Sequence, residues 1–167
     1  MNKNEIEKKF LVKNLPENLE QYEKIRIEQG YLNTIAAPTL RIRKQNQEYI
    51  LCYKFKQKTK LNVASVSKEV ELTLTEEAYE HLKTKIDGRM IEKDRYLLPL
   101  KNGLTAELDV FDGFFKGLEV VEVEFSSEEE ASKFEAPDWF GKDVSLDSRY
   151  KNAQLCKLSN VAEILKK

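Results

Sequence analysis

The sequence, 167 residues long, has few of the residues that several common classes of enzyme depend on. Its one histidine, His81, lies in a predicted surface helix over 75–86, so a histidine-centred mechanism has little support. The two cysteines, Cys52 and Cys156, are not spaced as zinc ligands or as a redox pair, and we expect free thiols. There is no glycine-rich phosphate loop. Any phosphate would therefore be bound by side chains rather than by backbone amides.

The balance of charge and the lack of long apolar runs exclude further classes. Lysine and arginine together number 28 and aspartate and glutamate 29, which gives a formal net charge of −1. This balance argues against a nucleic-acid duplex as a partner, because such binding depends on a surplus of positive charge. No apolar run is long enough to span a membrane, and no segment resembles a signal peptide. We expect a single domain over residues 1–167, located in the cytoplasm.

Charged residues that alternate with apolar ones are what the sequence has instead. Glu5, Glu7 and Lys9 alternate with Ile6 and Phe10, so in an extended strand the three charged side chains share one face. The same pattern returns in later segments, and the charged faces sort by sign. The basic positions are Lys9, Arg41, Arg43, Lys54, Lys56, Lys93 and Arg95, and the acidic positions are Glu5, Glu7, Glu69, Glu71, Glu107, Asp109, Glu122 and Glu124.

About eight strands joined mostly by short turns are predicted, and a sheet of that size normally curls or closes. Helices are expected over 75–86, with Thr75 as N-cap, and over 126–136, with Ser126 or Ser127 as N-cap. The tail over 143–167 is mostly helical in pattern. We therefore expect a mainly β fold of the α+β class. Its centre would be a closed, eight-stranded antiparallel tunnel with a charged interior, flanking helices and a C-terminal helix.

The energetics of the charged faces indicate what such a tunnel would hold. Two like charges about 6 Å apart repel by roughly 3 kcal/mol at an effective dielectric constant of about 20. Cations that face one cavity therefore favour a bound polyanion, unless each is neutralised by a carboxylate. The carboxylates in turn favour a hard divalent cation. Each charged pair alone is also typical of an exposed strand face. Their repetition, segregated by sign, favours a polyanion-binding barrel over that alternative.

The segment "EIEKKF" resembles the ExExK signature of the CYTH-type triphosphate tunnel metalloenzymes. The resemblance continues, in chain order, through "QGYL", "LRIR", "YKFK", "EVEL", "KDRY", "AELDVF", "EVEF" and "DSRYKN". It covers nearly the whole chain and implies the same eight-stranded antiparallel tunnel.

The resemblance also implies roles for individual residues. Triphosphate would be bound by Lys9, Arg41, Arg43, Lys54, Lys56, Lys93 and Arg95, with Lys142 and Arg149 as later contacts at one tunnel mouth. Mg2+ or Mn2+ would be bound by Glu5, Glu7, Glu69, Glu71, Asp109, Glu122 and Glu124, with Glu107 as a further candidate. Lys9 and Tyr31 would assist catalysis, although Tyr31 is equally suited to a structural place at a strand end.

Several activities are implied by the family, and the sequence favours one of them. A cyclase would carry a His-Phe pair ahead of the ExExK segment, and residues 1–4 contain no such pair. The chain most resembles short bacterial inorganic triphosphatases. We expect metal-dependent hydrolysis of the terminal phosphoryl group of inorganic tripolyphosphate, or of a nucleoside or thiamine triphosphate. The alternatives are a thiamine triphosphatase, an adenylate cyclase, and a non-catalytic polyphosphate- or nucleotide-binding module. A homodimer is one expected assembly.

Overall fold

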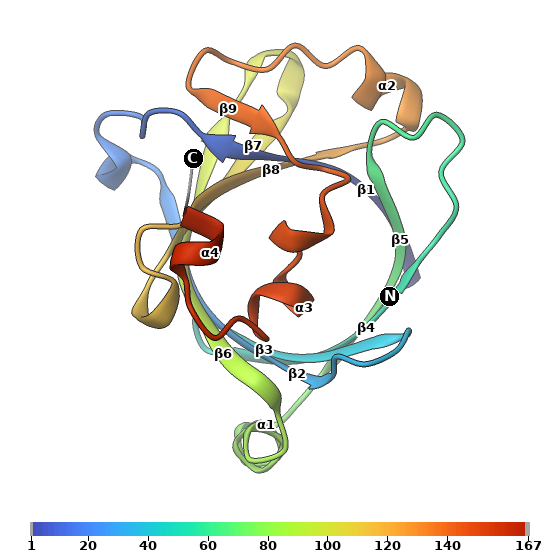
Figure 1. Cartoon of the computed structure of the whole chain (residues 1–167), viewed down its shortest axis with the longest axis vertical. Helices are drawn as coiled ribbons and strands as arrows, with labels where there is room; N and C mark the ends of the chain where they lie inside the picture. The colour runs from blue at the N-terminus through green and yellow to red at the C-terminus, as the bar shows by residue number, and fades with distance from the viewer. Residues whose placement is uncertain (1, 166–167) are drawn as a thin grey trace.

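The computed structural model describes residues 2–165, and its centre is one antiparallel sheet that closes on itself (Figure 1). The strands are β1 Asn2–Val12, β2 Glu23–Asn33, β3 Thr39–Gln45, β4 Glu48–Lys56, β5 Ser65–Thr73, β6 Asp87–Pro99, β7 Thr105–Phe111, β8 Glu119–Phe125 and β9 Phe140–Asp143. The order is β5-β4-β3-β2-β6-β7-β8-β1-β9, and a further pairing of β5 with β1 closes the first eight strands. The expected eight-stranded antiparallel tunnel is confirmed, and β9 is an additional strand beside β1.

The helices are short and lie outside the barrel or at its end. They are α1 Glu76–Lys83, α2 Glu128–Ser132, α3 Asn152–Leu155 and α4 Ala162–Leu165, with single 3-10 turns at Leu19–Gln21, Lys101–Gly103, Gly113–Phe115 and Ser148–Tyr150. Thr75 caps α1 by accepting a hydrogen bond from the Ala78 amide at 3.2 Å, and Ser127 caps α2 in the same way, as expected. His81 is exposed on α1. Within residues 2–165, no helix has the length and apolar character needed to cross a membrane.

The C-terminal tail differs from the expected mostly helical segment. It begins with β9 and continues through the 3-10 turn Ser148–Tyr150 to two helices of four residues each. Side chains that bond to nearby backbone explain the interruption, because such bonds compete with helix formation. The Asp143 carboxylate accepts from the Ser145 amide at 2.9 Å, and Asp147 accepts from the Arg149 amide at 3.1 Å. The tail therefore turns over one end of the barrel, where α3 projects into the ring of strands (Figure 1).

Two apolar cores hold the barrel. In the first, α2 and β9 cover the outer faces of β1, β7 and β8, with Phe10, Val121, Val123, Phe125 and Phe140 among its buried residues. The second core fills the end of the barrel under the tail, where inward-facing strand residues meet tail residues. Its buried members include Tyr31, Ile91, Phe111, Val120, Tyr150, Leu155 and Ile164. This second core closes one end of the tunnel.

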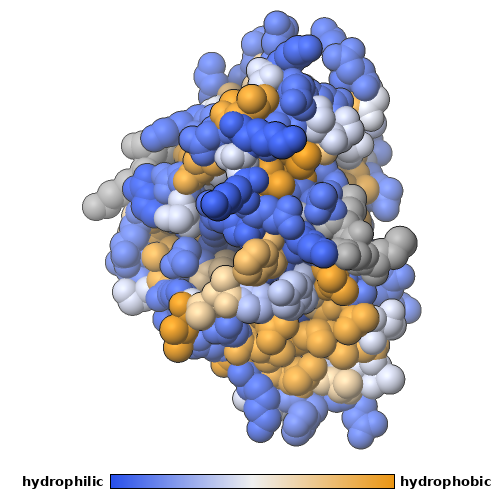
Figure 2. Space-filling model, turned by 90° about the vertical axis from the view of Figure 1, so that its right-hand side faces the viewer, coloured by the Kyte–Doolittle hydropathy of each residue, from blue (hydrophilic) through white to orange (hydrophobic). Residues whose placement is uncertain are grey.

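The outer face of β4 and β5 is apolar and partly uncovered. Tyr53, Phe55 and Leu72 are among the exposed large hydrophobic residues. Figure 2 shows a hydrophobic area on this side of the molecule, the side on which Figure 1 places β4 and β5. Because side chains alternate along a strand, Lys54 and Lys56 of β4 and Glu69 and Glu71 of β5 point the other way, into the barrel. The interior of the barrel is thus lined with charged side chains, and part of its apolar outer surface is exposed to solvent.

Candidate active site

The barrel encloses a cavity of about 680 Å3, a volume that suits a small molecule. Residues from seven strands bring the predicted charges together there. The charged lining residues predicted from the sequence are Glu5, Glu7, Lys9, Arg41, Arg43, Lys54, Lys56, Glu69, Glu71, Lys93, Arg95, Glu107, Glu122 and Glu124. Tyr31 lines the cavity too.

Three predicted site residues lie elsewhere. Asp109 is fully buried behind the lining, where its carboxylate accepts from Arg95 Nε at 2.7 Å and also pairs with Lys93. It therefore positions these two cations. The prediction that Lys142 and Arg149 contact phosphate at a tunnel mouth is not supported, since neither residue lines the cavity. Lys142 is exposed, and Asp147 holds the Arg149 guanidinium at 2.6 Å on the outside.

The sequence analysis missed several lining residues. Lys151 and Asn152 reach the cavity from the C-terminal tail, and Gln29 reaches it from β2. Lys151 belongs to the segment "DSRYKN", but it does not lie in a strand, so alternation gives no sign of its direction. Gln29 is uncharged, so the alternation of charged residues gives no sign of its place in the site. Two inward residues of β2, Ile25 and Ile27, are apolar and also line the cavity.

Most lining cations are already paired with carboxylates. Lys9 Nζ is 2.7 Å from Glu122 Oε1, and Arg41 Nη2 is 3.0 Å from Glu69 Oε1. Further pairs are Arg43 with Glu71, Lys54 with Glu5, Glu7 and Glu69, Lys93 with Asp109, and Arg95 with Glu107, Asp109 and Glu122. Among the described residues, Lys56 and Lys151 are the lining cations without an ion pair to a carboxylate. These two ammonium groups carry positive charge that an anion can meet without displacing a carboxylate.

The environment controls the charge of these cations. Burial opposes the charged form of Lys9, but Glu122 and Glu7 outweigh it and raise the pKa of the ammonium group. The same balance, with Glu7 and Glu5 as partners, raises the pKa of Lys54. Burial, followed by the nearby charges of Lys56 and Lys9, lowers the pKa of Lys151. A phosphate group near Lys151 would relieve that repulsion.

Carboxylates on β1 and β8 form a group with the chemistry of a divalent-cation site. Glu7 lies directly opposite Glu124 on the neighbouring strand, and Glu5 shares its face of β1. Burial, together with the charges of Glu122 and Glu5, raises the pKa of Glu7 to about 7 against the opposing effect of Lys54. Crowded carboxylates of this kind bind a proton or a metal ion to reduce their repulsion, and oxygen ligands suit Mg2+ or Mn2+. The residues present therefore fit such an ion.

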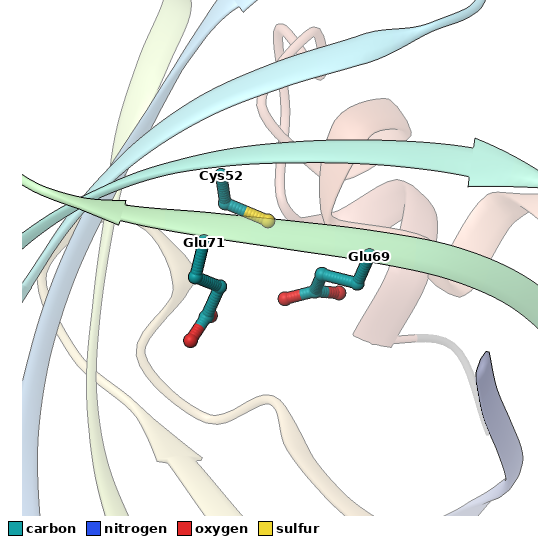
Figure 3. A group of neighbouring side chains, drawn as sticks. All are labelled: Cys52, Glu69 and Glu71. Carbon is teal, nitrogen blue, oxygen red and sulfur yellow. The ribbon is translucent and has the colours of Figure 1, made fainter. Parts of the chain in front are cut away.

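A second group combines Cys52 on β4 with Glu69 and Glu71 on β5, and Figure 3 shows their side chains close together. One ligand atom from each residue lies within 4.8 Å of the others. Guanidinium groups already occupy this place, because Arg41 Nη2 is 3.3 Å from Cys52 Sγ and 3.0 Å from Glu69 Oε1. Burial raises the pKa of the thiol to about 11 despite Arg41, so the thiol is neutral. Glu69 and Glu71 therefore orient Arg41 and Arg43. A metal ion at this place would be repelled by the two guanidinium groups.

The two predicted catalytic residues lie near the tail. Lys9 Nζ donates to the Tyr150 carbonyl oxygen at 3.2 Å in addition to its pair with Glu122. Tyr31 is buried, and burial raises the pKa of its hydroxyl group above the usual value despite Arg41 and Lys54. The hydroxyl is therefore protonated at neutral pH. Tyr31 can donate a hydrogen bond there, but it is not poised to act as a phenolate base.

The metal-free protein is expected to lose stability as the pH rises through about 7, because the folded state holds the Glu7 proton more tightly than the unfolded state. Between pH 5.5 and 7.5 the melting temperature in EDTA should fall by several degrees, since about 1 kcal/mol corresponds to roughly 2–4 °C in a chain of this size. Glu7→Gln should remove that part of the pH dependence. Calorimetry of the wild type and of Glu7→Gln at the two pH values measures the change in melting temperature. The same pH dependence in both proteins would refute the raised pKa of Glu7.

Comparison with known proteins agrees with this geometry. The CYTH domain family matches residues 3–152. An inorganic triphosphatase of Nitrosomonas europaea is 39% identical over 155 residues, which are 90% of this chain and 95% of that protein. An inorganic triphosphatase of Acetivibrio thermocellus is 33% identical over 158 residues, which are 92% of this chain and 93% of that protein. A crystal structure of the inorganic triphosphatase NE1496 has a TM-score of 0.69 at 37% identity and covers 93% of this chain and 96% of its own. The resemblance predicted from the sequence is confirmed, and the chain belongs to the CYTH family.

Proposed function

We propose that this protein is a metal-dependent hydrolase that removes the terminal phosphoryl group of inorganic tripolyphosphate inside its tunnel. The observation that carries the proposal is the cavity itself, where cations for a phosphate chain and carboxylates for a divalent ion line one enclosed space. Two relatives named inorganic triphosphatase, each matched over at least 90% of this chain, support the reaction class. We propose that the chain works as one domain in the cytoplasm, and a homodimer stays a prediction.

Substrate binding begins, in this proposal, with the cations that lack carboxylate partners. Lys56 and Lys151 attract the phosphate chain first, because neither has an ion pair to a carboxylate within the described residues that would have to be broken. Arg41, Arg43 and Lys54 then exchange part of their contact with Glu69, Glu71 and Glu5 for phosphate oxygens. Lys93 and Arg95 complete the basic set, held in place from behind by Asp109.

The proposed ligands for Mg2+ or Mn2+ are Glu5, Glu7, Glu122 and Glu124. When bound, such an ion supplies positive charge at the oxygens of the phosphoryl group that is transferred. Glu122 also pairs with Lys9 and Arg95, so it links the ion site to the phosphate site. The resemblance implied Glu69, Glu71 and Asp109 as ligands as well, but Asp109 is assigned here to Lys93 and Arg95. In the present proposal, Glu69 and Glu71 mainly orient Arg41 and Arg43.

Lys9 is proposed to stabilise the charge that develops on the phosphoryl oxygens during transfer. Its ammonium group is buried beside Glu122 and stays protonated, so it supplies a fixed positive charge and does not act as a base. Tyr31 is proposed to donate a hydrogen bond to the same phosphate chain. Since phosphoryl transfer depends mainly on positioning and electrostatics, these two fixed donors suit the reaction.

The lining favours an inorganic chain over an organic triphosphate. Tyr31 is the one aromatic residue among the described lining residues, and it is buried. Recognition of a base commonly uses an aromatic stacking surface, which this cavity offers only at that point. A thiamine triphosphatase or an adenylate cyclase is therefore less well supported. A non-catalytic binding module is disfavoured too, because its affinity for anions would suffer from so many carboxylates.

A screen for released phosphate tests the proposed function. With Mg2+ or Mn2+, tripolyphosphate should be hydrolysed at least tenfold more efficiently than pyrophosphate, ATP or thiamine triphosphate, as judged by kcat/KM. The reason is that the basic residues bind phosphates, whereas the described lining offers a base only one aromatic side chain, the buried Tyr31. Equal or better turnover of ATP, or cyclic AMP as a product, would contradict the choice of substrate.

A further inference from the structure

Gln29 is a polar residue of the cavity wall that the proposed function leaves without a role. It lies on β2 between Ile27 and Tyr31, and all three side chains line the cavity. Gln29 is only 1% exposed, and its Nε2 has no hydrogen-bond partner anywhere in the described part of the chain. Buried amide donors are nearly always paired, because an unpaired donor costs free energy. A donor kept unpaired in the wall of a binding cavity therefore indicates a partner that arrives from outside.

The strand partners of Gln29 and Tyr31 supply further buried donors. Gln29 lies directly opposite Arg43 on β3 and opposite Ile91 on β6. Tyr31, two residues further along β2, lies opposite Arg41. The Nε atoms of Arg41 and Arg43 are also buried without hydrogen-bond partners within residues 2–165. Three buried N–H donors on adjacent strands thus lack acceptors, and a ligand rich in anionic oxygens would satisfy them together.

An uncharged donor suits this position. Another lysine or arginine would be repelled by Arg41 and Arg43, which already face the same wall. A carboxylate would pair with those arginines and repel an incoming phosphate. An amide adds N–H donors without changing the charge. Its last side-chain torsion has a broad energy profile, so a turn of the amide can present Nε2 to the cavity.

We propose that Gln29 binds the substrate by donating a hydrogen bond from its amide to a phosphate oxygen of tripolyphosphate, beside Arg41 and Arg43. The proposal rests on the proposed function for the identity of the ligand. Loss of one hydrogen bond to a charged group lowers affinity by about tenfold or more. Gln29 would therefore contribute to the affinity and register of the phosphate chain, whose oxygens would pair with its buried Nε2.

Two variants and one control separate this role from a structural one. Gln29→Met keeps the approximate length of the side chain and removes the unpaired donor. Gln29→Glu keeps the shape and removes both N–H donors. Gln47→Met makes the same chemical change at an exposed position of the β3–β4 turn. For each protein, steady-state hydrolysis of tripolyphosphate with Mg2+, calorimetric binding of tripolyphosphate in EDTA, and the melting temperature are measured.

We expect the loss of the Gln29 donor to weaken binding without lowering the melting temperature. Gln29→Met should raise KM and the dissociation constant about tenfold, while its melting temperature stays equal to that of the wild type or rises. Gln29→Glu should bind more weakly still, and Gln47→Met should match the wild type. Wild-type affinity in both Gln29 variants would overturn the proposal, as would a parallel loss of melting temperature and binding in Gln29→Met with both retained in Gln29→Glu. If the wild type binds tripolyphosphate but does not hydrolyse it, the proposed reaction fails, and the binding data still decide the role of Gln29.

Discussion

Lys9→Ala should lower kcat for tripolyphosphate by at least two orders of magnitude. The substitution removes a buried positive charge from the site of transfer, where one such group is typically worth a factor of about 100 to 1,000. Stability should change much less. Glu122, the partner of Lys9, retains an ion pair with Arg95 Nη2 at 2.8 Å, so no carboxylate is left buried and unpaired. Steady-state kinetics and thermal melting with Mg2+ measure both effects.

Lys8→Ala is the matched control, because Lys8 lies one residue away on the opposite face of β1. Its ammonium group is 3.2 Å from Asp143 and 5.8 Å from the centre of the Phe10 ring, outside the cavity. Its removal should leave kcat within about twofold of the wild type, since ion pairs of this kind contribute little. Equal losses of turnover in Lys8→Ala and Lys9→Ala would contradict the inward placement of Lys9.

Glu124→Gln should reduce turnover by orders of magnitude and raise the Mg2+ concentration needed for half-maximal activity at least tenfold. The change keeps the size of the side chain but removes an anionic oxygen from the proposed ion site beside Glu7. Activity should recover in part at high Mg2+ or Mn2+, because the remaining carboxylates still bind the ion. Initial rates over a metal titration give both quantities.

The control for this substitution is Glu119→Gln on the same strand. Glu119 is an odd number of residues from Glu124 and does not line the cavity, so it lies on the other side of β8. The Glu119→Gln protein should need the same Mg2+ concentration for half-maximal activity as the wild type. A folded Glu124→Gln protein with wild-type turnover and an unchanged metal requirement would remove Glu124 from the ion site.

Alternation along the strands was enough to predict the barrel and most of its lining. Glu5, Glu7 and Lys9 share one face of β1 because neighbouring side chains point to opposite sides, and closure turns that face inward. Alternation along a strand does not indicate how deeply an inward-facing side chain is buried. Glu107 and Asp109 share a face of β7, yet Glu107 lines the cavity and Asp109 is completely buried behind it. The depth depends on which cations of the neighbouring strand cover the carboxylate.

The tail could not be predicted in the same way, because it has no strand or long helix to impose a period. Arg149 is turned outward by Asp147, two residues before it, whereas Lys151 after the same 3-10 turn faces the cavity. A one-turn element fixes side-chain direction through local capping bonds, and sequence spacing alone does not predict these. Gln29 was missed for a different reason, since an uncharged residue between Ile27 and Tyr31 resembles part of an apolar face.

The central claim is that the tunnel hydrolyses an inorganic triphosphate chain with the help of a divalent ion. Its most direct test is phosphate release from tripolyphosphate by the wild-type protein after removal of metal, followed by titration with Mg2+ or Mn2+. The prediction is negligible release without metal and full, saturable recovery on its addition. Undiminished hydrolysis after complete removal of metal would contradict the role of the carboxylates. Binding of tripolyphosphate without hydrolysis at any metal concentration would contradict the enzymatic function itself.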